Sequence, residues 1–281
     1  QIAVIESRDL QALTPAQLAG MRSSQIGALT SSQIASMSAA QISALRPDQS
    51  AALNAGGLNE WKTSQISALS TAQIGKLKTD QVAALESLQL SGLTPTQFVA
   101  LDSAQVRALT TDQIRLMSTR QVAALLPAQV SSLTSEQIKV VETADLRALS
   151  SAQMVSLISD QVVALESSQI SALLIPQVSS LTTRQVSVIE TGILRVLSSA
   201  QLSSLNPSQV QAFKTSQVVG LSTDQIIALH SGQISALRSS QVQAIEKIQI
   251  ESLRGGQVAS LTNAQITLLS SDQLTAIVTD A

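Results

Sequence analysis

The chain has 281 residues; apolar residues make up 44% of them but aromatic residues only 1%, so a thick globular core is not predicted. Charged residues are 13% of the chain, and 17 basic against 19 acidic residues leave a net charge of −2. This balance lacks the excess of basic residues that binding to nucleic acid or an anionic membrane requires. The absence of cysteine excludes disulfides and thiolate chemistry, and a single histidine, His230, excludes histidine metal clusters. We expect a protein that is not an enzyme, with no catalytic, cofactor-binding or metal-binding residue and no cofactor.

An eight-residue repeat runs through the whole chain from Gln1 onward. Cutting the sequence every eight residues gives 35 octads and then Ala281, with no insertion or deletion; typical octads are residues 65–72, 105–112 and 257–264. Position 1 is Gln in 31 octads, position 2 is apolar in 34, and position 5 is apolar in all 35. This uninterrupted eight-residue spacing predicts a single continuous array of repeats over residues 1–281, without a linker or a membrane span.

The order of residues within each octad predicts a short helix. Position 6 is Ser, Thr, Asn or Asp in 17 octads, which suits a helix N-cap, and the Gln three residues later completes the capping-box spacing. Position 7 is then the first helical residue, where proline is tolerated; it holds Pro15, Pro47, Pro95, Pro127 and Pro207. Where position 6 is Arg, Lys, Glu or Leu, we expect the cap to move to Ser or Thr at position 7.

Isolated helices of this length are unstable in water, so they must stack as a solenoid. Positions 2 and 5 would form a narrow aliphatic core, and the small residue common at position 4 would let helices approach closely. We predict an all-α solenoid. A β-solenoid is the alternative, because Ile and Val at position 2 and Thr at positions 6 and 7 suit strands and stacked Gln can form ladders.

The Gln column has two interpretations. It is either a row of amides for a polymeric ligand, or a structural column in which each Gln caps its own helix and reaches a carbonyl of the adjoining unit; the second is favoured because the column follows the cap. Four octads lack this Gln, and in two of them a carboxylate is expected to keep the capping bond: the replacements are Asp9, Gly57, Asp145 and Ile193. Two glycine pairs, at 56–57 and 255–256, are interpreted as loosened turns.

The remaining polar residues predict no chemical site. His230 is interpreted as an ordinary surface residue at a cap position. Basic side chains at position 3 are interspersed with acidic ones, and no aromatic side chains accompany them on which nucleic-acid bases could stack. These basic residues are Arg107, Arg115, Lys139, Arg147 and Arg195. Unusual caps recur at intervals averaging six octads, which could mark a superhelical turn or a duplicated block; they are Glu6, Asn54, Asp102, Glu142, Glu190 and Glu246.

The segments Leu69–Ile74 and Leu109–Ile114 show the pattern L-[ST]-x-x-Q-[IV], which recurs with variation along the octads. Arrays of L-[ST]-x-x-Q-[IV]-x-A resemble the octapeptide tracts of very large bacterial secreted or cell-surface proteins. The resemblance implies export to the extracellular space or cell surface and a structural, adhesin-like or filament-like task. It implies no catalytic residues.

We therefore expect a structural protein, an extended solenoid that forms an extracellular fibre, stalk or filament subunit. The alternative is a protein- or ligand-binding repeat scaffold of the adhesin kind. The first octad keeps Ile2 and Ile5 at core positions, and the last keeps Leu274 and Ile277 with Val278 besides. Neither is a polar terminal repeat. We therefore expect either head-to-tail self-association through the terminal repeats, or that the chain is part of a longer array.

Overall fold

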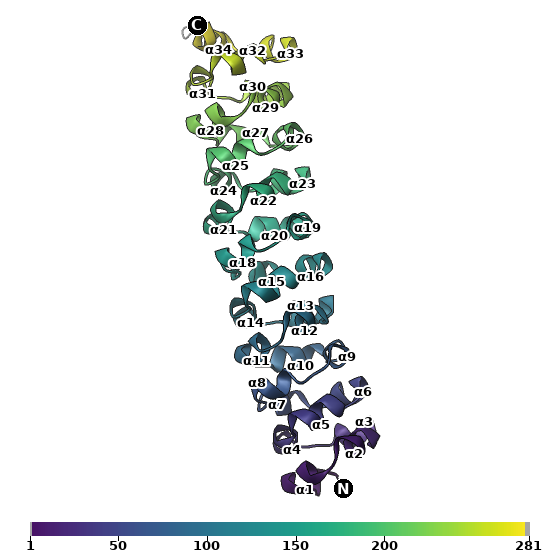
Figure 1. Ribbon diagram of the computed structural model, residues 1–281. Helices are drawn as coiled ribbons and strands as arrows, with labels where there is room; N and C mark the ends of the chain where they lie inside the picture. Colours follow the sequence, from purple (N-terminus) through teal and green to yellow (C-terminus); the bar gives the residue numbers. More distant parts are fainter. Residues whose placement is uncertain (1, 279–281) are drawn as a thin grey trace. The chain divides into compact units, whose positions relative to one another are not determined.

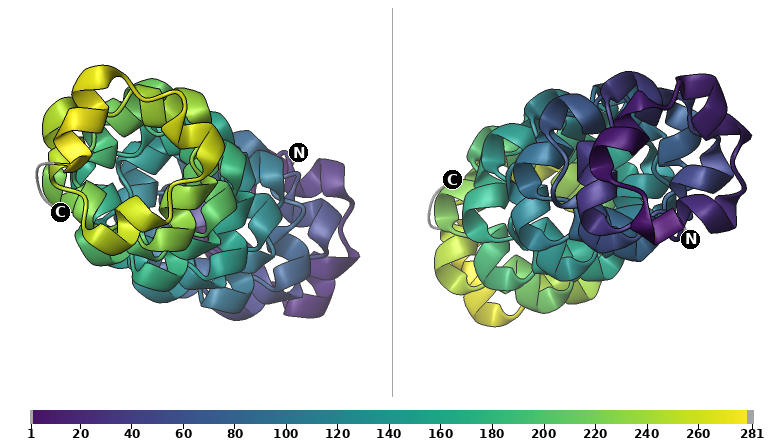
Figure 2. Two further views of the ribbon diagram at one scale, coloured as in Figure 1. Left: turned by 90° about the horizontal axis from the view of Figure 1, so that it is seen from above. Right: turned by 90° about the horizontal axis from the view of Figure 1, so that it is seen from below.

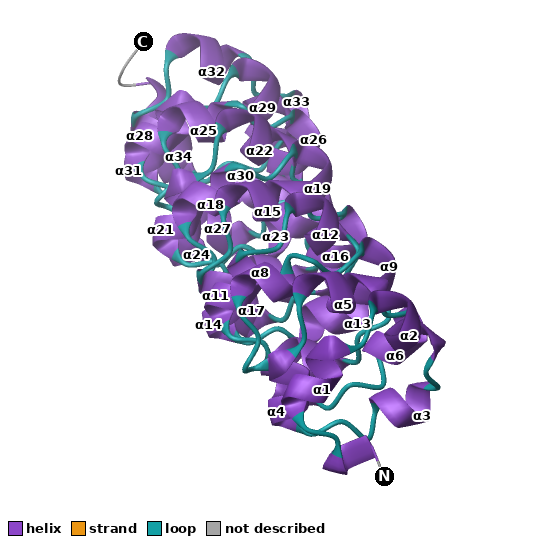
Figure 3. Cartoon of the chain, turned by 60° about the horizontal axis from the view of Figure 1, so that its bottom comes forward, coloured by secondary structure: helices purple, strands orange, loops and turns teal. Residues whose placement is uncertain are grey.

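The computed structural model describes residues 2–278, with the side chains of residues 3–277, and these residues form helices joined by short loops (Figures 1 and 3). A 3-10 helix, η1 (Ile2–Val4), precedes a series of α-helices of four to eight residues, one for each octad after the first. No strand occurs between residues 2 and 278, so the all-α prediction is confirmed over this range and the β-solenoid is wrong. The chain divides into two compact units, Gln1–Ala148 (unit 1) and Leu149–Ala281 (unit 2).

Unit 1 contains α1 (Ser7–Ala12), α2 (Pro15–Gly20), α3 (Ser23–Ile26), α4 (Ser31–Ser36), α5 (Ala39–Ala44), α6 (Pro47–Ser50), α7 (Ala55–Leu58), α8 (Thr63–Ile66), α9 (Thr71–Ile74), α10 (Thr79–Ala84), α11 (Ser87–Ser91), α12 (Pro95–Val99), α13 (Ser103–Ala108), α14 (Thr111–Arg115), α15 (Thr119–Ala124), α16 (Pro127–Ser132), α17 (Ser135–Lys139) and α18 (Thr143–Arg147). Unit 2 contains α19 (Ser151–Ser156), α20 (Ser159–Ala164), α21 (Ser167–Ala172), α22 (Ile175–Ser180), α23 (Thr183–Val188), α24 (Thr191–Leu194), α25 (Ser199–Ser203), α26 (Pro207–Gln211), α27 (Thr215–Val219), α28 (Thr223–Ala228), α29 (Ser231–Ala236), α30 (Ser239–Gln243), α31 (Lys247–Glu251), α32 (Gly255–Ala259), α33 (Asn263–Ile266) and α34 (Ser271–Val278).

Helix starts follow the predicted capping box. At α13, the backbone N–H of Gln105 donates to the Asp102 carboxylate at 2.8 Å, and the Asp102 N–H donates to Gln105 Oε1 at 2.7 Å. The prediction that the cap moves to position 7 was wrong. The N-cap stays at position 6 when that residue has no suitable acceptor, as it does at Arg22, Lys62 and Leu126. The reason is the other half of the box: Gln Oε1 accepts the N–H of position 6 whatever its side chain is.

Two extended residues make each corner between helices. Leu109 (φ −59°, ψ 140°) ends α13 while its N–H still donates to the Val106 carbonyl, and Thr110 (φ −74°, ψ 159°) caps α14. No described residue has a positive φ, so the turn needs no glycine. A corner that most residue types can adopt allows the octad to repeat without insertions.

The helices of each unit coil with three octads to a turn. Each helix packs on the one three further along the chain, as in α1, α4 and α7 of unit 1 and α19, α22 and α25 of unit 2. End-on views show successive helices following one another around each turn (Figure 2). One turn is therefore 24 residues, so the interval of about six octads between unusual caps does not correspond to one superhelical turn.

The predicted core is confirmed, with position 2 and position 5 side chains buried along both units, including Phe98 and Phe213. Position 2 departs from this in the last octads of unit 2, where Ile266 and Leu274 are 40% and 41% exposed. No further turn of the described chain packs on these two side chains. The side chains of Ile2 and Val278 lie outside the described residues, and Ile5 and Ile277 are half-buried.

Far-UV circular dichroism is expected to show the double minimum of helices, because nearly every octad contributes about one and a half helical turns. The signal should disappear on denaturation and return on refolding, since the helices depend on stacking rather than on their own length. A dominant single minimum of the β type would contradict the fold.

Candidate functional site: the glutamine ladder

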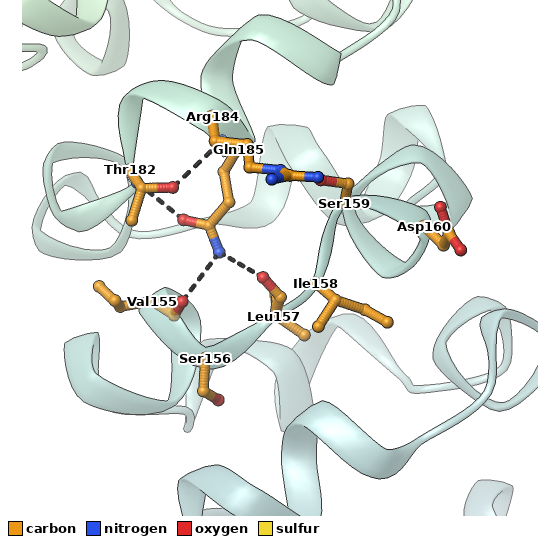
Figure 4. Close-up of a pocket in the computed structure, with 9 residues that line it drawn as sticks. All are labelled: Val155, Ser156, Leu157, Ile158, Ser159, Asp160, Thr182, Arg184 and Gln185. Carbon is orange, nitrogen blue, oxygen red and sulfur yellow. Dashed lines mark hydrogen bonds between the residues drawn. The ribbon is translucent and has the colours of Figure 1, made fainter.

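Gln185 shows how one Gln of the column is bonded (Figure 4). Its Oε1 accepts the N–H of Thr182 at 2.7 Å, and its own N–H donates to Thr182 Oγ1 at 3.1 Å. Its Nε2 donates to the carbonyls of Met154 and Leu157, both at 2.8 Å, and to that of Val155 at 3.3 Å. A single buried amide therefore caps α23 and satisfies the carbonyls that end α19.

The same bonds recur along both units. Gln41 Nε2 donates to the carbonyls of Leu13 and Leu10 at 2.8 and 3.0 Å. In unit 2, Gln233 Nε2 donates to the carbonyls of Leu205 and Leu202 at 2.7 and 3.1 Å. In each case one acceptor is the position 5 carbonyl 28 residues earlier. We call this set of Nε2 bonds the glutamine ladder.

The structural interpretation of the Gln column is thus confirmed, with one correction to its geometry. The amide reaches the preceding turn of the solenoid rather than the octad next to it in sequence. The alternative, amides displayed to a polymeric ligand, is wrong for the column as a whole because most of these Gln side chains are buried. Gln17 is exposed and Gln25 half-buried; neither has a preceding turn of described residues beneath it.

Where Gln is replaced, the turns are joined differently. Gly57 has no amide, but Asn54 Nδ2 donates to the Leu29 carbonyl at 2.9 Å in its place. The prediction that Asp145 keeps the capping bond was wrong: its carboxylate accepts the Thr119 hydroxyl of the turn below at 2.6 Å, and Glu142 has no side-chain cap bond. The carboxylate of Asp is one methylene too short to turn back to its own N-cap. The Asp9 helix likewise lacks a side-chain cap bond.

The glycine pairs are helical, so the prediction of loosened turns was wrong. Gly56 and Gly57 lie in α7, and Gly255 and Gly256 open α32. At Gly57 a Cβ would come within 2.8 to 3.0 Å of three side-chain atoms of Ile34. Close packing of α7 on α4, rather than backbone freedom, accounts for that glycine.

Some charged side chains pair on a single helix, and others bond to the neighbouring turn. Arg115 pairs with Asp112 at 2.9 Å and Lys139 with Glu136 at 2.8 Å, each on its own exposed helix surface. Arg238 instead donates from Nη2 to the Phe213 carbonyl of the turn below at 2.7 Å. A bond from the Ser23 hydroxyl, aided by Arg46, holds the pKa of Asp48 below its usual value.

His230 serves as a helix cap. Its Nδ1 accepts the N–H of Gln233 at 3.3 Å, which gives the imidazole the role that Ser or Thr has elsewhere. The interpretation of His230 as a surface residue at a cap position is confirmed. Between residues 2 and 278 no three His, Asp or Glu side chains gather in a way that could hold a metal ion.

Several exposed apolar side chains lie on or next to α19 and α22, which pack on each other. Val155, Ile158, Leu174 and Ile175 are exposed there, at octad positions that mostly hold polar or small residues. A groove beside this face is lined by Ile158, Thr182 and Arg184, whose Nε donates to the Ser159 hydroxyl at 3.0 Å (Figure 4). We call these four exposed side chains the aliphatic face.

None of the helices in the described range has the length and hydropathy that crossing a membrane requires. Short stacked helices with a repeated core and a repeated hydrogen-bond ladder define an α-solenoid repeat protein.

The chain belongs to the ALTTAQ repeat family. The family model matches about three quarters of the sequence, at residues 2–39, 58–87, 82–118, 98–135, 138–174, 186–223 and 207–239. The six letters correspond to octad positions 4 to 8 followed by position 1, as in Ala108–Gln113. A search of curated proteins found no match.

Proposed function

We propose that the protein is a structural, non-enzymatic element: an extended solenoid that forms a fibre, stalk or filament subunit outside a bacterial cell. The observation that carries the proposal is the glutamine ladder. Each turn donates amides to the turn before it and offers position 5 carbonyls to the turn after it. Such bonding adds turn to turn without a natural limit, which suits a protein whose task is length. The extracellular and bacterial setting comes from the resemblance of the octads to secreted repeat tracts.

The same bonds support the proposal that the protein self-associates head to tail. In the first octads of unit 1, the Nε2 groups of Gln17 and Gln25 donate to no carbonyl of the described chain. In the last octads of unit 2, the Leu261 and Leu269 carbonyls receive no Gln amide, and Ile266 and Leu274 are exposed. A second copy stacked in phase would bury these apolar side chains, and Gln17 of that copy would lie over the Leu269 carbonyl. The contact is heterologous and open, so it propagates as a filament.

An engineered disulfide tests the register of this contact. Within unit 1, a Cβ built on Gly92 would lie 3.5 Å from the Thr63 Cβ, a residue 29 positions earlier, which is within disulfide range. The corresponding pair across a head-to-tail junction is Ser271 of one copy and Gly20 of the next. Since the chain has no cysteine, Ser271→Cys with Gly20→Cys is expected to give a ladder of covalent oligomers under mild oxidation.

Thr63→Cys with Gly92→Cys is the positive control and should close within one chain. Either terminal cysteine alone should give dimers at most. Ile5→Lys with Ile277→Lys should abolish the oligomers seen by sedimentation and negative-stain microscopy while the helical signal remains. A monodisperse monomer of residues 1–281 at high concentration would contradict self-association.

A binding scaffold of the adhesin kind is the second candidate, and the aliphatic face favours it. Its four side chains are exposed apolar residues on or next to two packed helices, and exposed apolar side chains are common in recognition surfaces. Ile158→Thr with Ile175→Ser restores residue types that other octads have at these positions. This double variant should keep the melting temperature and the state of self-association of the parent protein. Reduced adhesion of the variant to whole cells would then assign binding to this face.

A further inference from the structure

The glutamine ladder of unit 2 has one gap. Thirteen position 5 carbonyls lie between Leu149 and Ile245, and twelve of them accept a Gln Nε2 from the turn above. The exception is Leu165. This residue is 1% exposed, and no donor of the described chain reaches its carbonyl. A buried carbonyl without a donor is costly, so the gap weakens the stacking of the turn above it.

The gap has a definite cause in the sequence. The residue 28 positions after Leu165 is Ile193, which is half-buried and has no amide. The residue 25 positions after Leu165 is Glu190, at the octad position from which Arg238 reaches the Phe213 carbonyl. The Glu190 carboxylate only accepts hydrogen bonds and makes no side-chain cap bond. Neither position therefore supplies the missing donor.

Helix α24 is weak in other respects as well. It has four residues and no capping box, and its Thr191 carbonyl accepts the Arg195 N–H at a long 3.4 Å. Gly192 lies in the first turn of α24, and a Cβ at this position would have no heavy atom within 4 Å. No close contact therefore requires glycine here, and its loss of backbone entropy on folding is not compensated by packing. Helix α24 packs on α21 in the turn below, and within the described part of the chain no side-chain hydrogen bond of α24 joins the two turns.

The other replaced octads above a described turn keep a bond to it. Asn54 bonds the Leu29 carbonyl at the octad of Gly57, and Thr119 bonds Asp145. Ile193 has no such substitute. We propose that residues 190–197, with α24 at their centre, form a built-in joint: the segment of unit 2 inside its ladder that opens first under heat, denaturant or tension. All the residues concerned lie inside unit 2. None of the observations behind the joint depends on the proposed function.

Hydrogen exchange followed by mass spectrometry tests the joint on the full chain. The amides of Leu194 and Leu197 in the joint have counterparts one octad later at Leu202 and Leu205, with the same backbone bonds. We expect the α24 amides to exchange about tenfold faster than those of α25, the effect of roughly one buried hydrogen bond.

Two reciprocal variants separate the missing amide from other causes. Ile193→Gln supplies the donor to the Leu165 carbonyl and should slow exchange in α24 about tenfold, whereas Ile193→Leu should leave it unchanged. Gln201→Ile removes the donor to the Leu173 carbonyl and should create a second fast segment at α25. Equal exchange in α24 and α25 of the parent would overturn the proposal, as would an Ile193→Gln variant with parental exchange and an unchanged helical signal.

Discussion

Replacing Leu109 or Leu181 by aspartate is expected to lower the free energy of unfolding by about 4 kcal/mol. Both side chains occupy position 5, with exposures of 4% and 5%. The core at this position is aliphatic, and the nearest polar groups are carbonyls and amides already bonded in the glutamine ladder. An introduced carboxylate would find no cation or free donor, so it would be buried unpaired or would open the turn.

Urea and thermal melts followed by circular dichroism measure this effect. Leu88→Asp is the matched control: Leu88 is 68% exposed in the first turn of α11, where a carboxylate interacts favourably with the helix dipole. The control should melt within about 0.5 kcal/mol of the parent. If Leu109→Asp and Leu181→Asp melted like Leu88→Asp, position 5 would not be the core.

Much of the fold could be predicted from one octad, because its determinants are local. The capping pair of Asp102 and Gln105 lies within four residues, and the apolar pattern at positions 2 and 5 requires only that one helix face be buried. Each is repeated in nearly every octad. Repetition turns weak local preferences into a reliable prediction of an all-α solenoid.

The number of octads in a turn could not be predicted in this way. It depends on the angle that two extended residues impose at each corner, such as Leu109 and Thr110, and small changes of φ and ψ there would give a different coil. The acceptor of each Gln depends on that number, since the carbonyl 28 residues earlier lies below the amide only when three octads make a turn. The joint at α24 was missed for the same reason. In sequence, Ile193 is one of four replaced Gln residues, and only the coil shows which replacements keep a bond to the turn below.

The predictions for octads with Arg, Lys, Glu or Leu at position 6 failed because they considered only one half of the capping box. A residue such as Leu126 was expected to lose the cap because its side chain cannot accept a hydrogen bond. The Gln129 amide oxygen still accepts the Leu126 N–H at 2.7 Å, and this half of the box is enough to hold the helix start in place. The Gln column therefore fixes the phase of the helices as well as the stacking of the turns.

The glutamine ladder itself is tested by Gln233→Glu, a change of one side-chain nitrogen to oxygen. Gln233 is fully buried and its Nε2 donates to the Leu205 and Leu202 carbonyls. A carboxylate placed there would lose both donors and set a negative charge against two carbonyl oxygens. We expect a loss of about 3 kcal/mol at neutral pH. Gln211→Glu, on an exposed side chain one turn of the coil earlier, is the matched control and should change stability by less than about 0.5 kcal/mol.

The loss should also depend on pH in a definite direction. Burial and the two carbonyls raise the pKa of the introduced carboxyl in the folded protein above its unfolded value, because the protonated form alone can donate to Leu205. The protonated, better-bonded state is therefore fully present below the unfolded pKa and is lost as pH rises through the folded one. Melts of the two variants near pH 4 and near pH 8, about the range over which a raised carboxyl pKa titrates, should show the gap between Gln233→Glu and Gln211→Glu widening with pH. A gap that stayed constant would mean that the amide contributes shape alone, and that the carbonyls of the turn below do not need its hydrogens.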